Sequence, residues 1–219
     1  MPRLLFEKTG NALWISHLDL MRVFQRAFKR SNLPLVHTQG FNPRPSVSIA
    51  LPLSVGIGSR CELLDFDLDN CDVSCEEIKN RLNQNLIDGV KVMDVYEGGR
   101  KIRELALLNC TVTLEYDNGV PDNAQGKIAA LFSADSLMVP KKTKNGLKDQ
   151  DIIPMIRSLA VRQIGENAIE IASTVCCQNP TLNPMQISLA IFKYLPELKA
   201  DFVHCLRVEV LDSNEKIFR

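Results

Sequence analysis

Residues 1–100 show strand-like and helix-like patterns in the order β-α-β-β-α-β. In the third strand-like segment, Leu64, Phe66 and Leu68 alternate with aspartates, which is typical of a strand with one buried and one solvated face. Between the strand patterns, apolar residues recur at helical spacing. The predicted strands are residues 3–8, 46–51, 62–69 and 90–95. One predicted helix begins at residue 16, and a second runs from about residue 75 to residue 85.

This order is that of the ferredoxin-like fold, in which right-handed crossovers place both helices on one face of a four-stranded antiparallel sheet. The second half repeats the plan less regularly. Its predicted strands are 111–116, 136–139, 159–164, 168–175 and 202–211, with helices around 128–132 and 184–194. We therefore predict an α+β chain of two ferredoxin-like halves with antiparallel sheets and helices on one face, residues 1–100 and 101–219.

The formal net charge of zero excludes a uniformly polycationic chain, but the charges are unevenly distributed. Residues 1–48 carry seven basic and two acidic side chains, and the next stretch is acidic. The seven cysteines show no zinc or iron–sulfur spacing, and no apolar run approaches the length of a membrane span. The sequence also shows no export signal. We predict a cytoplasmic protein with reduced thiols, no metal, no cofactor and no membrane contact.

Ser16 is expected to cap the first helix, with Asp19 as the acidic partner of a capping box. His17 then stands in the first turn, where the helix dipole disfavours an imidazolium. A neutral His17 could act as a general base, or it could only fill space beside the cap, and both readings stay open. The basic side chains Arg22 and Arg26 fall mostly opposite the apolar face of this helix.

Residues 37–46 read HTQGFNPRPS and join the first helix to the second strand. Pro43 and Pro45 force Asn42 and Arg44 toward extended geometry. Side chains on such stiff backbone bind at a lower ordering cost. A plain connector is the competing reading, and the single glycine disfavours a phosphate cradle. The candidate contact residues of this stretch are Gln39, Gly40, Phe41, Asn42 and Arg44.

The coincidence of basic residues and an aromatic in one short segment favours RNA or another anionic partner. Phosphate neutralisation needs several cations, and single-stranded RNA adds stacking on exposed aromatic rings. A lysine-rich segment in the second half adds further positive charge. The complete candidate binding set is His17, Asp19, Arg22, Arg26, Gln39, Gly40, Phe41, Asn42, Arg44, Lys141, Lys142 and Lys144.

Three motifs of residues 3–70 resemble a bacterial family known as radical SAM-linked proteins, a domain of unknown function found beside or fused to the C-terminus of a radical SAM protein. They are Ser16-His17-Leu18-Asp19, Gln39-Gly40-Phe41-Asn42-Pro43 and Leu51-Pro52-Leu53-Ser54-Val55-Gly56. The family usually has histidine after its Asn-Pro, where this chain has Arg44, so an imidazole role at that position does not carry over.

The resemblance implies a bacterial protein that works with a radical SAM partner, in a genomic context of ribosome and RNase functions. It implies no activity of its own. We therefore expect a non-catalytic accessory module that binds RNA or a ribosome-associated substrate and presents it to that partner. The alternatives are a protein–protein adaptor for the radical SAM subunit, and an RNA-processing enzyme of the double-ferredoxin type that uses His17.

Overall fold

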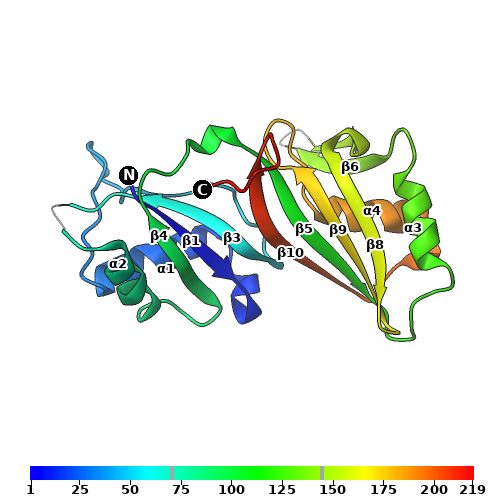
Figure 1. Ribbon diagram of the computed structural model, residues 1–219, viewed down its shortest axis with the longest axis horizontal. Coiled ribbons are helices and arrows are strands. Elements are labelled where there is room, and N and C mark those ends of the chain that lie inside the picture. The colour runs from blue at the N-terminus through cyan, green and yellow to red at the C-terminus, as the bar shows by residue number, and fades with distance from the viewer. Residues whose placement is uncertain (70–71, 144–145) are drawn as a thin grey trace. The chain divides into compact units, whose positions relative to one another are not determined.

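The computed structural model describes residues 1–69, 72–143 and 146–219 (Figure 1). The chain divides into two compact units. The N-terminal unit comprises Met1–Ile102 together with Arg219, and the C-terminal unit comprises Arg103–Phe218. The described part of the chain is a mixed α+β structure with four α-helices, and its strands pair in a mostly antiparallel arrangement. None of the described helices is long and apolar enough to cross a membrane.

The elements of the N-terminal unit follow the order β-α-β-β-α-β. In the sheet, β1 lies between β4 and β3, and β2 pairs with the other side of β3. Their bounds are β1 (Arg3–Lys8), α1 (His17–Arg30), β2 (Val47–Ile49), β3 (Ile57–Phe66), α2 (Cys75–Asn83) and β4 (Val90–Tyr96), with a 3-10 turn at Gly10–Trp14 between β1 and α1.

One face of this sheet packs against both helices. Phe6 of β1 meets Phe24 of α1 edge to face, with ring centroids 4.7 Å apart. The ring centroids of Phe66 of β3 and Phe28 of α1 are 4.9 Å apart. Leu82 of α2 is fully buried in the same cluster. The alternation in residues 62–69 thus does place alternate side chains against helices. The strand itself begins at Ile57, earlier than predicted, because Ser59 and Cys61 are also buried.

Two cations of the basic N-terminal stretch lie inside the unit and are not available to a partner. Arg3 is only 4% exposed and donates to both carboxylate oxygens of Asp65, at 2.6 and 3.1 Å. Lys8 is fully buried, and its ammonium donates to the carbonyls of Leu13 at 3.1 Å and Ile15 at 2.9 Å. Counting charges along residues 1–48 therefore overstates the positive surface.

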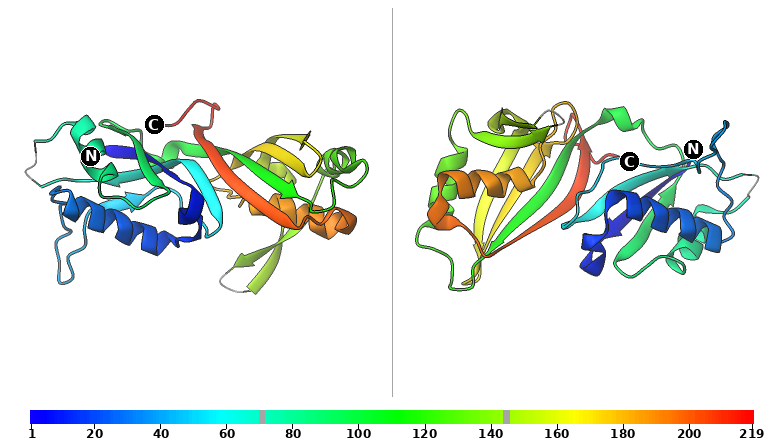
Figure 2. Two further views of the ribbon diagram at one scale, coloured as in Figure 1. Left: turned by 90° about the horizontal axis from the view of Figure 1, so that it is seen from below. Right: turned by 180° about the vertical axis from the view of Figure 1, so that it is seen from behind.

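The C-terminal unit has the order β-α-β-β-α-β with an inserted hairpin. Its sheet runs β10-β5-β9-β8, and β6 and β7 form a separate two-stranded sheet. The right panel of Figure 2 shows α4 crossing in front of this unit's strands. The bounds are β5 (Leu105–Glu115), α3 (Ala124–Phe132), β6 (Met138–Thr143), β7 (Gly146–Asp151), β8 (Ile156–Ile164), β9 (Ala168–Cys176), α4 (Met185–Tyr194) and β10 (Phe202–Asp212).

The strand predicted at residues 136–139 does not belong to the main sheet of this unit. It is the start of β6, which pairs with β7 from Met138 opposite Asp151 to Thr143 opposite Gly146. The second strand of the sheet is β8 instead, which pairs with β9 along its length. Pro140 lacks an N–H and could not serve in the middle of a larger sheet, whereas a short hairpin tolerates it.

Candidate functional site

Residues 37–45 form a narrow projecting loop, which we call the 37–45 arm. Its two sides are joined like the strands of a hairpin. The N–H of Thr38 donates to the carbonyl of Arg44 at 2.8 Å, and the N–H of Arg44 returns to the Thr38 hydroxyl at 3.0 Å. Just below, the N–H of Ser46 donates to the carbonyl of Val36 at 2.7 Å. The prolines alone predicted a stiff connector, and these bonds add a ladder.

The base of the 37–45 arm is fixed to the segment that follows β3. The N–H of Val36 donates to the carbonyl of Asp67 at 2.9 Å, and the Ser46 hydroxyl donates to its carboxylate at 3.1 Å. Nδ1 of His37 lies 2.9 Å from the carbonyl of Leu35 and donates to it, since a carbonyl oxygen can only accept. His37 therefore also holds the base of the arm.

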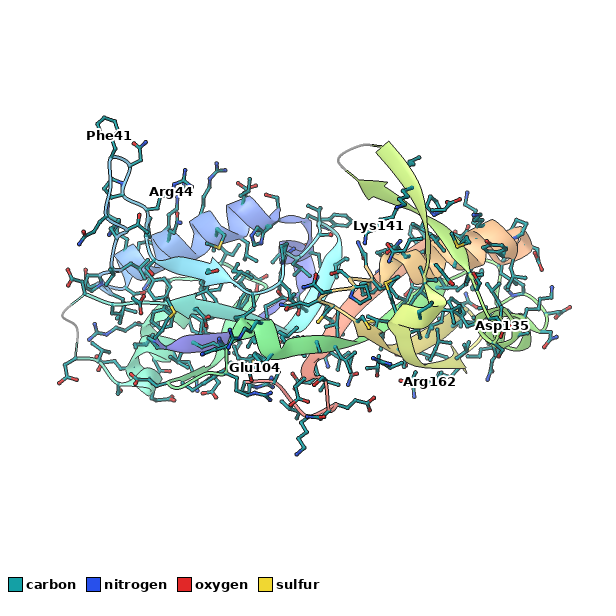
Figure 3. The ribbon with its side chains drawn as sticks, turned by 90° about the horizontal axis from the view of Figure 1, so that it is seen from above. Phe41, Arg44, Glu104, Asp135, Lys141 and Arg162 are labelled. Atoms are coloured by element: carbon teal, nitrogen blue, oxygen red, sulfur yellow. The ribbon has the colours of Figure 1, made fainter. Side chains whose placement is uncertain are left out.

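The tip of the 37–45 arm displays Phe41, whose side chain is 100% exposed. Figure 3 shows Phe41 at the outer end of the arm and Arg44 on its returning side. Gly40 allows the tight reversal, since its φ of +138° is a conformation that side-chain-bearing residues rarely adopt. Gln39 and Asn42 are exposed beside it. The arm thus holds a fully exposed aromatic ring on a hydrogen-bonded backbone.

The exposed cations near the arm differ in how far they are already engaged. Arg22 forms an ion pair of 2.7 Å with Asp19, and Arg30 donates to the carbonyl of Asn85 at 2.6 Å. Within the described residues, no ion pair or hydrogen bond engages the side chains of Arg26, Lys29 and Arg44, all of which are exposed. We call these three residues the free cation set.

Asp19 and Ser16 form the predicted cap. The Ser16 oxygen accepts from the N–H of Asp19 at 3.2 Å, and its hydroxyl donates to the Asp19 carboxylate at 2.7 Å. This hydrogen bond from Ser16, with a further one from Arg22, lowers the pKa of Asp19. Asp19 is thus occupied by the helix start, which leaves it no evident part in binding.

His17 lies at the opposite end of α1 from the 37–45 arm. The helix has 14 residues and is therefore about 21 Å long. Nδ1 of His17 is buried and has no hydrogen-bond partner among the described residues. A third group that orients the base is part of the usual signature of a catalytic base. Among the described residues no hydrogen bond to Nδ1 orients His17, so the structure does not add support to the enzyme hypothesis.

An exposed apolar patch beside His17 was not singled out from the sequence. It consists of Trp14, Leu18 and Val55, which are 72%, 68% and 52% exposed. The N–H of Gly56 donates to the carbonyl of Leu13 at 2.9 Å, and a Cβ on Gly56 would lie 3.6 Å from the Trp14 ring. The segment 51–56 therefore meets the turn that precedes α1. The sequence signal for this patch was the run of apolar residues in segment 51–56, which was predicted to be a loop.

The lysine-rich segment forms the β6–β7 hairpin. Lys141 donates to the carbonyl of Thr181 at 3.2 Å. Lys142 pairs with Leu147 through its backbone, while its side chain and all of Lys144 lie outside the described residues. This hairpin connects α3 to β8, and the 37–45 arm lies in the connection of α1 to β2. Both predicted binding segments thus extend the same connection of their units.

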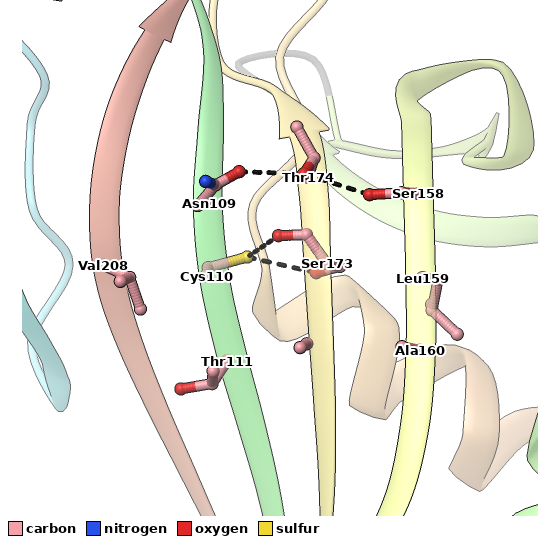
Figure 4. A pocket seen from close by; sticks show the side chains of 10 residues that line it. Asn109, Cys110, Thr111, Ser158, Leu159, Ala160, Ser173, Thr174 and Val208 are labelled. Carbon is pink, nitrogen blue, oxygen red and sulfur yellow. Dashed lines mark hydrogen bonds between the residues drawn. The ribbon is translucent and has the colours of Figure 1, made fainter. Parts of the chain in front are cut away.

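The C-terminal sheet carries a shallow hollow of about 350 Å³ on the face that its helices leave open (Figure 4). The Ser158 hydroxyl donates to Thr174 at 3.0 Å, which donates to the Asn109 side-chain oxygen at 2.8 Å. Burial raises the pKa of the neighbouring Cys110 to about 11, so its thiol stays neutral and weakly nucleophilic. Cys110 is therefore not an activated nucleophile in this hollow.

Two further buried cysteines have thiols that burial keeps neutral. Burial raises the pKa values of Cys177 and Cys205 to about 12. No described group of three or more histidine, cysteine, aspartate or glutamate side chains is placed to hold a metal ion.

Comparison with known proteins gives a family and a fold likeness. The model of a family described as an uncharacterized protein conserved in bacteria, DUF2344, matches residues 2–184. No curated protein matches the chain. A chain of a crystal structure of a Cbf5–Nop10–Gar1 complex is similar over 95% of this chain, with a TM-score of 0.52 and 10% identity, and this chain spans about half (48%) of its length. A crystal structure of an unknown protein from Galdieria sulphuraria aligns over 94% of this chain and 97% of its own at 10% identity, with a TM-score of only 0.26.

Proposed function

The chain belongs to the DUF2344 family of proteins conserved in bacteria, and from the geometry of its N-terminal unit we propose that it binds single-stranded RNA. The 37–45 arm and the free cation set form the contact surface in this proposal. The chain acts in the cytoplasm as an accessory module without a reaction of its own. The RNA, either free or as part of a ribosome-associated substrate, is presented to a radical SAM protein, the partner that the sequence resemblance implies.

The full exposure of Phe41 is the observation that carries the proposal. An exposed aromatic ring on a hydrogen-bonded loop is preorganised, so little conformational entropy is lost when a base stacks on it. Every base has a π-face, and stacking therefore tolerates sequence differences. Gln39 and Asn42 flank the ring, and their amides can reach the polar edge of a stacked base.

The free cation set supplies the second part of an RNA site. Single-stranded RNA is held largely through its phosphates, and guanidinium or ammonium groups already paired with carboxylates would first have to give up those partners. Arg26, Lys29 and Arg44 need no such exchange among the described residues. Arg44 lies on the arm, and the other two cations lie near the C-terminal end of α1. In this proposal the three cations contact phosphates on either side of the base that stacks on Phe41.

We assign the ferredoxin-like plan to both units as part of this proposal. In each unit the element order is β-α-β-β-α-β, and the first strand lies between the fourth and the third. This plan is what the order of periodicities in residues 1–100 favours. It places the connection after the first helix at the edge of each sheet, where a projecting segment can reach a ligand without disturbing the core.

Replacing Phe41 by alanine is expected to weaken binding of a labelled single-stranded RNA about tenfold, because one base loses the ring on which it stacks. Fluorescence anisotropy with a ten-nucleotide RNA measures this effect. Phe202 of β10 is also exposed and provides the matched control, because Phe202→Ala removes an aromatic ring from the other unit. Equal affinity of the Phe41→Ala protein and the unmodified chain would remove the arm from the RNA site.

A second function, docking of the radical SAM protein, is favoured by the apolar patch of Trp14, Leu18 and Val55. Exposed tryptophan is rare on free surfaces and enriched at the centres of protein interfaces. The patch also joins two of the three motifs that carry the family resemblance. We propose that this patch holds the partner protein while the arm holds RNA at the other end of α1.

Trp14→Ser is expected to weaken co-purification with a co-expressed radical SAM partner, while RNA affinity stays unchanged. The loss should be at least about tenfold, as for an interface anchor. Met93 of β4 is an exposed apolar residue outside the patch, and Met93→Ser is the control. Undiminished co-purification of the Trp14→Ser protein would reject the docking role of this patch.

A further inference from the structure

The C-terminal unit contains a cavity of about 470 Å³ that the RNA proposal does not use. It lies between the β6–β7 hairpin and the beginning of α4, and its volume is in the range of small-molecule sites. Pro140 contributes to its wall. The side chains that matter for its chemistry are Lys141, Leu147, Thr181, Asn183, Gln186 and Leu189.

Gln186 lines this cavity, and its side chain carries an unpaired hydrogen-bond donor among the described residues. Its side chain is only 5% exposed, and its oxygen accepts from the N–H of Asn183 at 3.2 Å. Because that backbone N–H can only donate, it fixes which end of the amide is oxygen. The other end, Nε2, is buried and has no partner among the described residues. Buried amide nitrogens are normally hydrogen-bonded, so this one is suited to an acceptor that enters the cavity.

Lys141 adds a positive charge to the same wall. Its ammonium donates to the carbonyl of Thr181 at 3.2 Å, and an ammonium has three hydrogens. The hydrogen bond therefore anchors the side chain at the cavity and leaves donors for a ligand. No carboxylate is among the side chains that line the described part of the cavity.

The rest of the cavity is apolar. Leu147 of β7 and Leu189 of α4 both line it, and both are exposed to solvent, so the cavity is open on this side. One cation and one amide donor beside leucine side chains differ from a phosphate site, which typically uses several charged or backbone donors. A single cation, a single amide donor and an apolar wall suit a ligand that has one negatively charged group attached to an apolar body.

We propose that this cavity binds a carboxylate carried by an apolar group. One carboxylate oxygen accepts from Nε2 of Gln186, and the carboxylate also pairs with the Lys141 ammonium. The apolar body lies against Leu147 and Leu189. The same chemistry is offered by a free aliphatic acid and by the C-terminus of a peptide that ends in an apolar residue.

Two probes test the proposal on the full chain by isothermal titration and by NMR shift mapping. They are hexanoate and the tripeptide acetyl-Ala-Ala-Leu with a free C-terminus, each compared with its uncharged amide. We expect saturable binding of at least one acid, with its amide at least about tenfold weaker. The acid that binds more tightly shows whether the natural ligand is a free aliphatic acid or the C-terminus of a peptide. If neither acid binds saturably, the cavity holds water only and the proposal is wrong.

Gln186→Glu and Lys141→Met are the decisive variants, and each should weaken binding at least about tenfold. Gln186→Glu keeps the oxygen that accepts from Asn183 and removes the donor. Lys148 stands opposite Lys141 in the hairpin but does not line the cavity, so Lys148→Met makes the same charge change as a control. Leu147→Ala, at an exposed position, should weaken binding several-fold without unfolding. Unchanged affinity in the Gln186→Glu protein, or equal losses in both lysine variants, would overturn the assignment.

Discussion

Replacing Arg26, Lys29 and Arg44 together by glutamate is expected to weaken binding of single-stranded RNA at least about a hundredfold at low salt. Each substitution removes a favourable phosphate interaction and adds a repulsive one. Because the free cation set has no internal partners among the described residues, its charge is fully available to RNA before the change. Affinity measured from low to high salt should also show the slope of log K against log salt fall by about two, at roughly 0.7 per phosphate.

The control for this experiment is an equal charge change elsewhere on the same unit. Arg60, Lys91 and Lys101 are exposed and lie outside the arm and α1, so their triple glutamate variant alters the net charge by the same amount. Retained affinity in this control, with loss in the first variant, locates the RNA at the arm. Equal losses in both proteins would mean diffuse attraction and would contradict a defined site.

Lys8→Met is expected to lower the free energy of unfolding by about 2–4 kcal/mol, the second large effect that the structure implies. Methionine replaces the methylene chain of the fully buried lysine but cannot donate to the carbonyls of Leu13 and Ile15. Those carbonyls belong to the turn between β1 and α1. Each would lose the lysine donor, while the Leu13 carbonyl would keep its bond from the N–H of Gly56. Urea unfolding monitored by circular dichroism measures the change.

Lys91→Met, at an exposed lysine of β4, is the control and should change stability by less than about 0.5 kcal/mol. A competing effect favours the opposite result, because removing a buried charge also removes its desolvation cost. If that cost exceeds the two hydrogen bonds, the Lys8→Met protein will be more stable than the parent. That result would show that the lysine is retained for the shape of the turn rather than for stability.

Local patterns predicted most elements of the N-terminal unit because their apolar residues recur at strand or helix spacing, although β3 is buried on both faces rather than on one. Leu64 and Phe66 alternate with Asp65 in the sequence, and they do face the helices while Asp65 pairs with Arg3. The sequence did not predict the early start of β3, because residues around Ser59 and Cys61 show no alternation between apolar and polar side chains. The place of β6 was missed for another reason, since strand propensity does not state which strand is the partner.

The candidate site was predictable only in part. Prolines predicted the stiffness of the arm, and a helical wheel predicted the exposure of Arg26. Pairing between side chains is not encoded in spacing alone, so Arg22 and Asp19 were counted as ligands although they bind each other. The burial of Lys8, with its partners five and seven residues further along, likewise depends on the path of the turn. The exposure of Trp14 could not be read from a residue type that is usually buried.

The shared position of the 37–45 arm and the β6–β7 hairpin has a consequence for how such chains diversify. Each extends the connection between a first helix and the second strand of its sheet, and neither supplies strands to the sheets themselves. Doubling the length of a flexible connection costs only about 0.6 kcal/mol. The two segments can therefore be lengthened or exchanged independently of each other and of the cores. A loop graft at either position should yield a folded protein with new ligand preferences.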